Sequence, residues 1–282
     1  MKAHAERHIR RSELFQLILL QHLYARPESS SLIFQGGTAI RWCHNSGRFS
    51  EDLDFVTHLE RPALERLMKG VEGAVARESI AHFGPGRLTF TPRRERDEGV
   101  VWRAAFEPQN MRDRIMVKIE CERLREGTAV ASEPRVLGMQ TAVSYLIARG
   151  EFRIPRPNSV LLVETLEEIL SDKVRALLER PYLKGRDIYD VWHLRDRLGV
   201  SLDRDVMERK FTCYAAAFTA RRLPDWFESA DSDLKVAIEN DLGRFLAPEV
   251  MATCRNDEYR LFLEALKGLF REMRETGVVI PS

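Results

Sequence analysis

The stretch FQGGTAIRWCHNSGRFSEDLDFV, residues 34–56, decides the fold because it joins a glycine turn to a short acidic strand. It ends in Asp52 and Asp54, one residue apart, and side chains alternate between the two faces of a strand. Both carboxylates therefore project to one side, while Leu53 and Phe55 project toward the core. Two carboxylates within reach of one cation suit Mg²⁺. The alternative interpretation is an exposed polar strand face.

The residues before the acidic strand predict a turn that can receive phosphate. LIFQGG (32–37) is typical of a short buried strand that runs into a tight turn, and TAIRWCH (38–44) of a helix capped by Thr38. Gly36 and Gly37 would let phosphate groups approach the backbone, with amide groups at the helix start as donors. The sequence contains neither a P-loop nor a dinucleotide-binding glycine motif.

A third carboxylate comes from VKIECER, residues 117–123, where apolar and polar residues alternate as in a half-buried strand. Glu120 lies on the polar face, and this strand could lie beside the acidic one. Phosphoryl-transfer sites with two divalent ions usually need one ligand more than a D-x-D pair supplies, so Glu120 is the candidate. The alternative is a surface residue paired with Lys118 or Arg123.

The chain of 282 residues is long enough for one large domain or two medium ones. Four strands are predicted, at residues 52–56, 87–92, 100–108 and 114–124. Helical periodicity covers 61–83 and an N-terminal segment for which Ser12 is a candidate cap. We expect an α+β domain over residues 1–163 and a helical domain over 164–282, with a short strand in the connecting segment 153–164.

Composition is that of an ordinary globular protein, with 44% hydrophobic and 31% charged residues. No apolar run reaches the roughly 20 residues needed to cross a bilayer. The N-terminal run LFQLILL lacks the cleavage site of a signal peptide, so we expect a cytoplasmic protein with no membrane partner. The four cysteines are far apart and the seven histidines show no ligand spacing, so neither disulfides nor zinc chemistry is supported.

Nucleic-acid binding would have to come from local patches, because 44 basic residues balance 43 acidic ones and leave a net charge of +1. Three arginine clusters are candidates for RNA contact, namely Arg7, Arg10 and Arg11, then Arg93, Arg94 and Arg96, then Arg221 and Arg222. A solvated surface is the common explanation of such clusters.

Two helices of the second half place charged residues near their apolar faces. In ETLEEILSDKVRALLE (164–179), Lys173 shares the inward side with leucines, where a lysine requires an anion or must extend its amine to the surface. Asp187 and Asp190, three residues apart on the next helix, lie near its apolar face. A pair between Arg186 and Asp190 is the purely structural explanation.

Five motifs, in order over residues 34–194, give the chain a family resemblance. They are G-G-T-A-x-R (36–41), R-x-S-x-D-L-D-F (48–55), K-x-E (118–120), S-x-K-x-x-A-L (171–177) and R-D-x-Y-D-x-x-x-L (186–194). Together they resemble the AbiEii/AbiGii toxin family, the nucleotidyltransferase-like toxins of bacterial toxin–antitoxin systems. The resemblance implies a DNA polymerase β-like nucleotidyltransferase core with a mixed sheet, followed by a helical domain.

The resemblance also implies roles for the motif residues. The metal ligands, for Mg²⁺ or Mn²⁺, would be Asp52, Asp54 and Glu120. The nucleotide-binding residues would be Gly36, Gly37, Thr38, Arg41, Arg48, Ser50 and Lys173. Glu120 would also help deprotonate the acceptor hydroxyl. Asp187 or Asp190 would shape the catalytic site, with no assignment between the two, and Arg41 and Arg48 would either contact phosphate or brace the loop.

Under this resemblance the protein transfers NMP from an NTP to an RNA acceptor, preferably the 3′ end of tRNA, and so blocks translation and growth. A cognate antitoxin encoded nearby, acting without a stable complex, is the implied partner. One alternative keeps the fold as a catalytically inactive nucleotide-binding regulatory or interaction protein. Another is a metal-dependent nuclease, which needs neither the glycine turn nor a lysine that faces a triphosphate.

Overall fold

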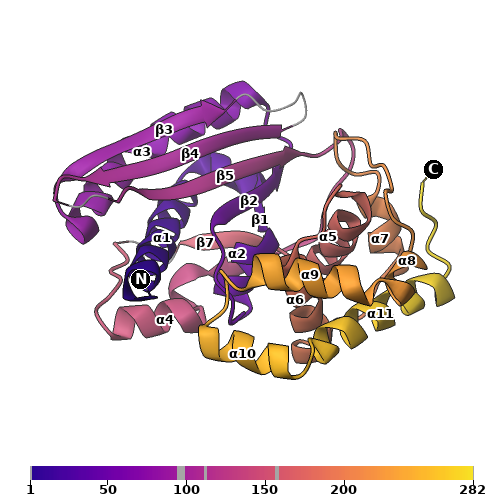
Figure 1. Ribbon diagram of the computed structural model, residues 1–282. Coiled ribbons are helices and arrows are strands. Elements are labelled where there is room, and N and C mark those ends of the chain that lie inside the picture. The colour runs from indigo at the N-terminus through magenta and orange to yellow at the C-terminus, as the bar shows by residue number, and fades with distance from the viewer. Residues whose placement is uncertain (1, 94–98, 111–112, 156–158, 282) are drawn as a thin grey trace. The chain divides into compact units, whose positions relative to one another are not determined.

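The computed structural model describes residues 2–93, 99–110, 113–155 and 159–281 (Figure 1). The chain divides into two compact units, which we call the sheet unit and the helical unit. The sheet unit consists of Met1–Asn45, Phe49–Gly127 and Ser132–Val163. The helical unit consists of Ser46–Arg48, Thr128–Ala131 and Glu164–Ser282.

A mixed sheet forms the centre of the sheet unit. Its strands are β1 (Leu32–Gln35), β2 (Asp52–Thr57), β3 (Gly86–Arg93), β4 (Gly99–Pro108), β5 (Ile115–Arg123), β6 (Ser132–Val136) and β7 (Val160–Glu164). Within the described residues the strand order is β3-β4-β5-β2-β1-β7-β6. β2 runs parallel to β5 and antiparallel to β1, and β1 runs parallel to β7. The acidic strand β2 therefore lies in the middle of the sheet.

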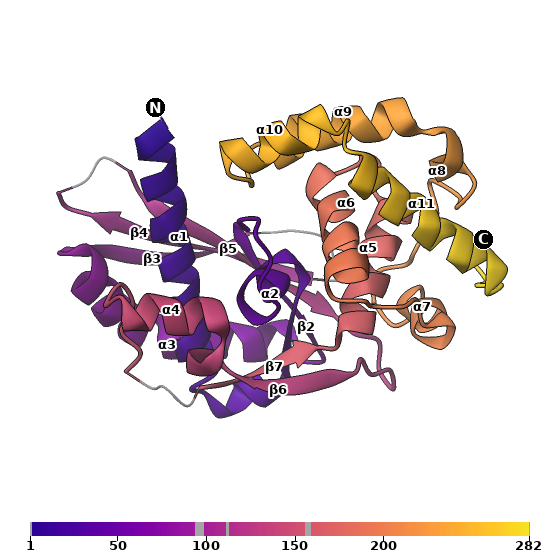
Figure 2. The ribbon, with the colours of Figure 1, turned by 90° about the horizontal axis from the view of Figure 1, so that it is seen from below.

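Helices cover one face of this sheet (Figure 2). The helices of the unit are α1 (Lys2–Leu23), α2 (Gly36–Cys43), α3 (Arg61–Phe83) and α4 (Thr141–Ala148), with short 3₁₀ turns at Pro27–Ser31 and Leu137–Met139. α1 packs against α3 and β5, and α3 packs against β3 and β4. Leu53, Phe55 and Ile119 are fully buried. Asp52 and Asp54 alternate with these apolar residues of β2, so they lie on the opposite face.

The helical unit is built from seven helices in its described part, together with the π-helical segment His193–Arg197. They are α5 (Leu166–Glu179), α6 (Gly185–Trp192), α7 (Arg204–Lys210), α8 (Trp226–Ser229), α9 (Asp231–Leu242), α10 (Pro248–Asn256) and α11 (Arg260–Glu275). α6 packs against α5, α9 and α11, and α5 packs against α7. No described helix of the chain combines the length and apolarity that crossing a bilayer requires.

The strands and the helix predicted from periodic patterns are present, whereas the two predicted helix caps are wrong. The four expected strands and the helix over 61–83 are confirmed as β2, β3, β4, β5 and α3. α1 begins at Lys2, so Ser12 lies inside the helix and does not cap it. α2 begins at Gly36 after the extended residue Gln35, so Thr38 is a helical residue. Its hydroxyl donates a hydrogen bond to the main-chain carbonyl of Asp52 instead.

The short strand expected within 153–164 is β7, which pairs with β1. Residues 156–158 of that segment lie outside the described residues. β6 was not expected, because its sequence SEPRV has no alternation of apolar and polar residues.

Candidate functional site

Gly36 brings the backbone of the β1–α2 turn against an acidic side chain. Its φ of 76° lies in the left-handed region that favours glycine. Across the antiparallel β1–β2 pair, Gln35 is the partner of Asp54, which places Asp54 beside the turn. A Cβ atom on Gly36 would lie 2.6 Å from Oδ2 of Asp54. Both the backbone conformation and the room for this carboxylate therefore require glycine.

Neighbouring residues hold the turn and the acidic strand together. The buried Thr38 hydroxyl bonds to the carbonyl of Asp52, the first residue of β2. The side-chain amide of Gln16 donates to the carbonyl of Ser50 at 2.7 Å, so α1 fixes the loop before β2. Trp42 of α2 donates in turn to the Gln16 side-chain oxygen at 3.1 Å. Thr38 and Gln16 thus fix the backbone on both sides of the start of β2.

Three carboxylates share the face of the sheet that the alternation predicts. Asp52 and Asp54 are half-buried, whereas the intervening Leu53 is fully buried. Asp54 and Glu120 are direct partners in the parallel β2–β5 pair, so their side chains project to the same face. Glu120 forms an ion pair with Lys118, as one alternative interpretation proposed. Within the described residues, the His, Cys, Asp and Glu side chains form no group of three or more that could hold a metal ion.

Arg41 braces the turn by several contacts within the sheet unit. Its Nε donates to Oε1 of Glu13 on α1 at 2.8 Å. Its guanidinium carbon lies 5.4 Å from the ring centroid of Trp42 and 5.5 Å from that of Phe49. Arg41 therefore ties α2 to α1 and to the loop before β2.

A second group of motif residues forms a chain of alternating charges in the helical unit. Nζ of Lys173 on α5 lies 3.0 Å from Oδ1 of Asp187 and 2.8 Å from Oδ2 of Asp190, both on α6. Arg180 pairs with the other oxygen of Asp187. Arg48 donates from Nε and Nη2 to the two oxygens of Asp190, each at 2.5 Å. The inward lysine has the anions that its position requires.

The paired charges outweigh burial, so they lower the pKa of Asp187 and Asp190 and raise the pKa of Lys173 and Arg48. Burial alone raises a carboxyl pKa, but Lys173 and Arg180 outweigh it and hold the pKa of Asp187 well below its usual value. Burial also acts on Asp190, and Arg48 and Lys173 outweigh it so that its pKa is lowered. Three cations against two carboxylates leave one positive charge in excess.

The sequence patterns gave no indication of Arg180. Arg180 directly follows α5 and has no periodic signal, because it reaches Asp187 from the turn between two helices. The structural alternative, in which Arg186 pairs with Asp190, is wrong. The main-chain N–H of Arg186 donates to Oδ2 of Asp241 at 3.1 Å, and its Nε lies 3.7 Å from the same oxygen. Arg48 forms the ion pair with Asp190 instead.

The family match covers the residues of both groups. Residues 18–272 match the family model described as the nucleotidyl transferase AbiEii toxin of a type IV toxin–antitoxin system. The chain belongs to the AbiEii toxin family. The matched range includes the glycine turn and acidic strand of the sheet unit and the Lys173 motif of the helical unit.

Two solved structures share the fold of this AbiEii family member. One, from H. pylori, is described as a "putative nucleotidyltransferase"; it is 17% identical, with a TM-score of 0.57 over 96% of both chains. The other is JHP933 from Helicobacter pylori, 16% identical, with a TM-score of 0.55 over 96% of this chain and 93% of that chain. No curated protein matches the chain.

Proposed function

We propose that this AbiEii family member is a metal-dependent nucleotidyltransferase that moves NMP from an NTP to an RNA hydroxyl and releases pyrophosphate. The observation that carries the proposal is the contact between the glycine turn and the acidic strand. Oδ2 of Asp54 lies 2.6 Å from the position that a Cβ of Gly36 would take, and Glu120 is the partner of Asp54 in the next strand. The arrangement supports a polymerase β-like core, with carboxylates on the face opposite α1 and α3.

The donor set fits a divalent cation by its chemistry. Asp52 and Asp54 would hold Mg²⁺ or Mn²⁺, and Glu120 would join them by exchanging its Lys118 partner. The bound ion would supply positive charge to the triphosphate and to the oxygens that attack and leave. Asp52 and Asp54 project from the same face of β2, and two like charges on one face favour a bound cation.

The remaining roles follow from what each side chain contacts. Gly36 and Gly37 leave the turn backbone open to phosphate. Thr38 ties this turn to the start of β2, and Gln16 fixes the carbonyl of Ser50 in the loop before β2. Glu120 would accept the proton of the acceptor hydroxyl. Arg41 acts as a brace.

In the helical unit, Lys173 would contact phosphate, as the family resemblance implies. Asp187 and Asp190 would orient its amine, because both bind it directly. Arg48, which is fully buried against Asp190, is a brace as well.

The acceptor is proposed to be RNA, preferably the 3′ end of tRNA, and the consequence a block of translation and growth. A cognate antitoxin encoded nearby would act without a stable complex. Both proposals rest on the type IV toxin–antitoxin family to which the chain belongs.

A labelling assay tests the proposed reaction. The protein is incubated with each α-labelled NTP, Mg²⁺ and total tRNA, and label in RNA and released pyrophosphate are measured. We expect transfer by the wild type and loss of at least about 10³-fold in Asp52→Ala with Asp54→Ala. Glu65→Gln removes a surface carboxylate from α3, paired only with Arg61 in the described contacts, and is expected to transfer normally. No transfer by the wild type, or equal transfer by the double variant, would sink the proposal.

A second candidate function, nucleotide binding without turnover, is favoured by the ion pair of Glu120 with Lys118. NTP titration with and without Mg²⁺ separates the two. Tight binding that Lys118→Met leaves unchanged, with no transfer to any acceptor, supports the binding protein. Transfer that increases in Lys118→Met supports the enzyme, because Glu120 is then released to its proposed role.

A further inference from the structure

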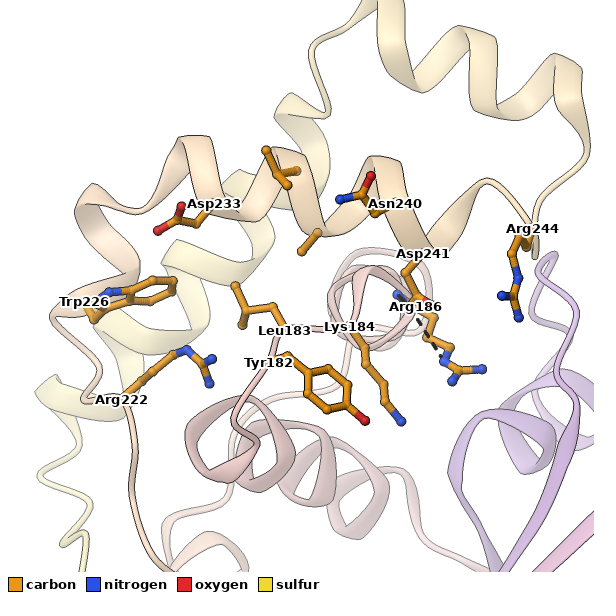
Figure 3. A pocket seen from close by; sticks show the side chains of 12 residues that line it. Tyr182, Leu183, Lys184, Arg186, Arg222, Trp226, Asp233, Asn240, Asp241 and Arg244 are labelled. Atoms are coloured by element: carbon orange, nitrogen blue, oxygen red, sulfur yellow. Dashed lines mark hydrogen bonds and ion pairs between the residues drawn. The ribbon is translucent and has the colours of Figure 1, made fainter.

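A pocket of about 570 Å³ lies in the helical unit between the start of α6 and α9 (Figure 3). We call it the α6–α9 pocket, and the residues that matter here are Tyr182, Lys184, Arg186, Arg222, Trp226 and Arg244. In Figure 3, Asp233 and Asn240 of α9 lie on one side of it, and Tyr182 and Lys184 lie on the other. Its volume is in the range of ordinary small-ligand sites.

Close backbone packing shapes the wall of this pocket. A Cβ atom on Gly185 would lie 2.6 Å from the carbonyl oxygen of Ala237 and 2.6 Å from Cα of Ile238. The first turn of α6 therefore sits directly on the α9 backbone. The bond from Arg186 N–H to Asp241 joins the same two helices. The lining residues are consequently held by a packed framework.

Positive charge exceeds negative charge around the pocket. Four cationic side chains line it, against the two carboxylates of Asp233 and Asp241. Arg186 is paired with Asp241. The Arg222 guanidinium donates to three main-chain carbonyls and, among the described residues, has no carboxylate within ion-pair distance. Lys184 has no ion pair with any described residue either. The surplus favours an anionic ligand.

The behaviour of Lys184 agrees with this excess. Burial, followed by the nearby charges of Arg180 and Arg186, lowers the pKa of Lys184 to about 8. Its surroundings thus disfavour the protonated amine of Lys184, and a bound anion would favour it.

Aromatic rings stand beside these cations. Tyr182 is 62% exposed, and the amine of Lys184 lies 5.9 Å from its ring centroid. The guanidinium of Arg222 lies 5.4 Å from the ring centroid of Trp226. Unstacked bases bind to exposed aromatic faces and backbone phosphates bind to the adjacent cations, which is the usual mode of single-strand recognition. The carboxylates of an acidic peptide would pair with the cations but have no aromatic face to stack on the rings.

We propose that the α6–α9 pocket binds a nucleotide of a single-stranded RNA segment, with its base on Tyr182 or Trp226 and its phosphate facing Lys184 and Arg222. The inference rests on the proposed function to the extent that this RNA is the acceptor. Of the arginine clusters considered from the sequence, it selects the one that contains Arg222. Arg94 and Arg96 of another cluster lie outside the described residues.

The test measures RNA binding without the reaction. A 5′-fluorescein-labelled uridine octamer is titrated with protein, in the absence of NTP and divalent metal, and fluorescence anisotropy is recorded. The pocket variant is Tyr182→Ala with Lys184→Gln, since these side chains contact each other and solvent. The control is Tyr145→Ala with Arg149→Gln, another exposed tyrosine under a cation at 5.5 Å, in the sheet unit. We expect about tenfold weaker binding by the pocket variant and a change below about twofold in the control.

Equal weakening in both variants, or none in either, overturns the proposal. Competition identifies the ligand. Unlabelled octamer should displace the probe, whereas AMP at the same nucleotide concentration and polyglutamate at the same charge concentration should not. Displacement by AMP as efficient as by the octamer would indicate a free-nucleotide site, and displacement by polyglutamate a peptide site; either overturns the RNA assignment.

Label transfer is then measured separately. If the wild type transfers no label but the pocket variant loses RNA binding, the RNA-binding proposal is supported and the proposed reaction is contradicted. If the pocket variant binds and labels RNA like the wild type, the reaction stands and the pocket proposal fails. Far-ultraviolet circular dichroism and a melting curve confirm that each variant is folded.

Discussion

Position 36 requires glycine for two reasons. Its φ is positive, and a Cβ atom would lie too close to the Asp54 carboxylate. Gly36→Ala would therefore strain the turn and displace the carboxylate. We expect label transfer to fall about 10²-fold, as displacements near 1 Å do in other active sites. Stability should fall by about 1–2 kcal/mol from the backbone strain. Initial rates and urea unfolding measure the two effects.

Gly150→Ala is the matched control for this variant. Gly150 has a φ of 70°, but a Cβ there would meet no atom within 4 Å. It should lose similar stability and retain transfer. Normal transfer by Gly36→Ala, or equal loss by both variants, would contradict the role given to the glycine turn.

At the scale of residues, the sequence predicted which face of a strand a side chain takes better than it predicted which residue that side chain contacts. Polar and apolar residues alternate over the first four residues of β2, which leaves Asp52 and Asp54 one side to occupy, so their common face could be predicted. The partner of Asp190 could not, because Arg48 is 142 residues away and periodicity carries no information over that distance. Thr38 shows the same limit, since both a cap and the Asp52 carbonyl are reasonable partners for a threonine hydroxyl.

The junction of α6 with α9 carries a prediction at the scale of elements. Gly185→Ala puts a methyl group 2.6 Å from the backbone of α9, which cannot yield as a flexible side chain could. We expect the free energy of unfolding to fall by about 1–3 kcal/mol, as for other overpacked contacts. Because α9 forms one side of the α6–α9 pocket, RNA binding should weaken as well. Urea denaturation and the anisotropy titration measure the two effects.

Gly268→Ala on α11 is the comparison, since a Cβ there would meet no neighbouring atom. Removal of a helical glycine should stabilise the protein by about 0.5–1 kcal/mol. A Gly185→Ala variant as stable as Gly268→Ala would show that α6 and α9 are not in the close contact described.

Helices and strands with a regular repeat of apolar residues could be predicted. A strand that is defined only by its pairing with a neighbouring strand could not. α3 and the strands β2 to β5 repeat apolar residues over six residues or more, which is enough to separate a helical from a strand period. β6 has five residues, of which none is fully buried, at the edge of the sheet beside β7. Its strand conformation comes from its neighbour and leaves no mark in its own sequence.

At the scale of the whole molecule, charge balance limits how RNA can be held. With a net charge of +1, the chain has no strong overall field to attract a polyanion, so binding should depend on the few cations of the α6–α9 pocket. For single strands, log K falls by about 0.7 per log unit of salt for each phosphate neutralised. Contacts from Lys184 and Arg222 predict a slope of about −1.4 for the uridine octamer.

Lys184→Gln alone should reduce this slope to about −0.7, whereas Tyr182→Ala should weaken binding and leave the slope unchanged, because stacking releases no counterion. Anisotropy titrations from 50 to 300 mM KCl measure both. A slope steeper than about −4 in the wild type would mean that many dispersed cations bind the strand, and an unchanged slope in Lys184→Gln would remove this lysine from the phosphate contact. The pair of variants thus separates the electrostatic part of the pocket from its stacking part.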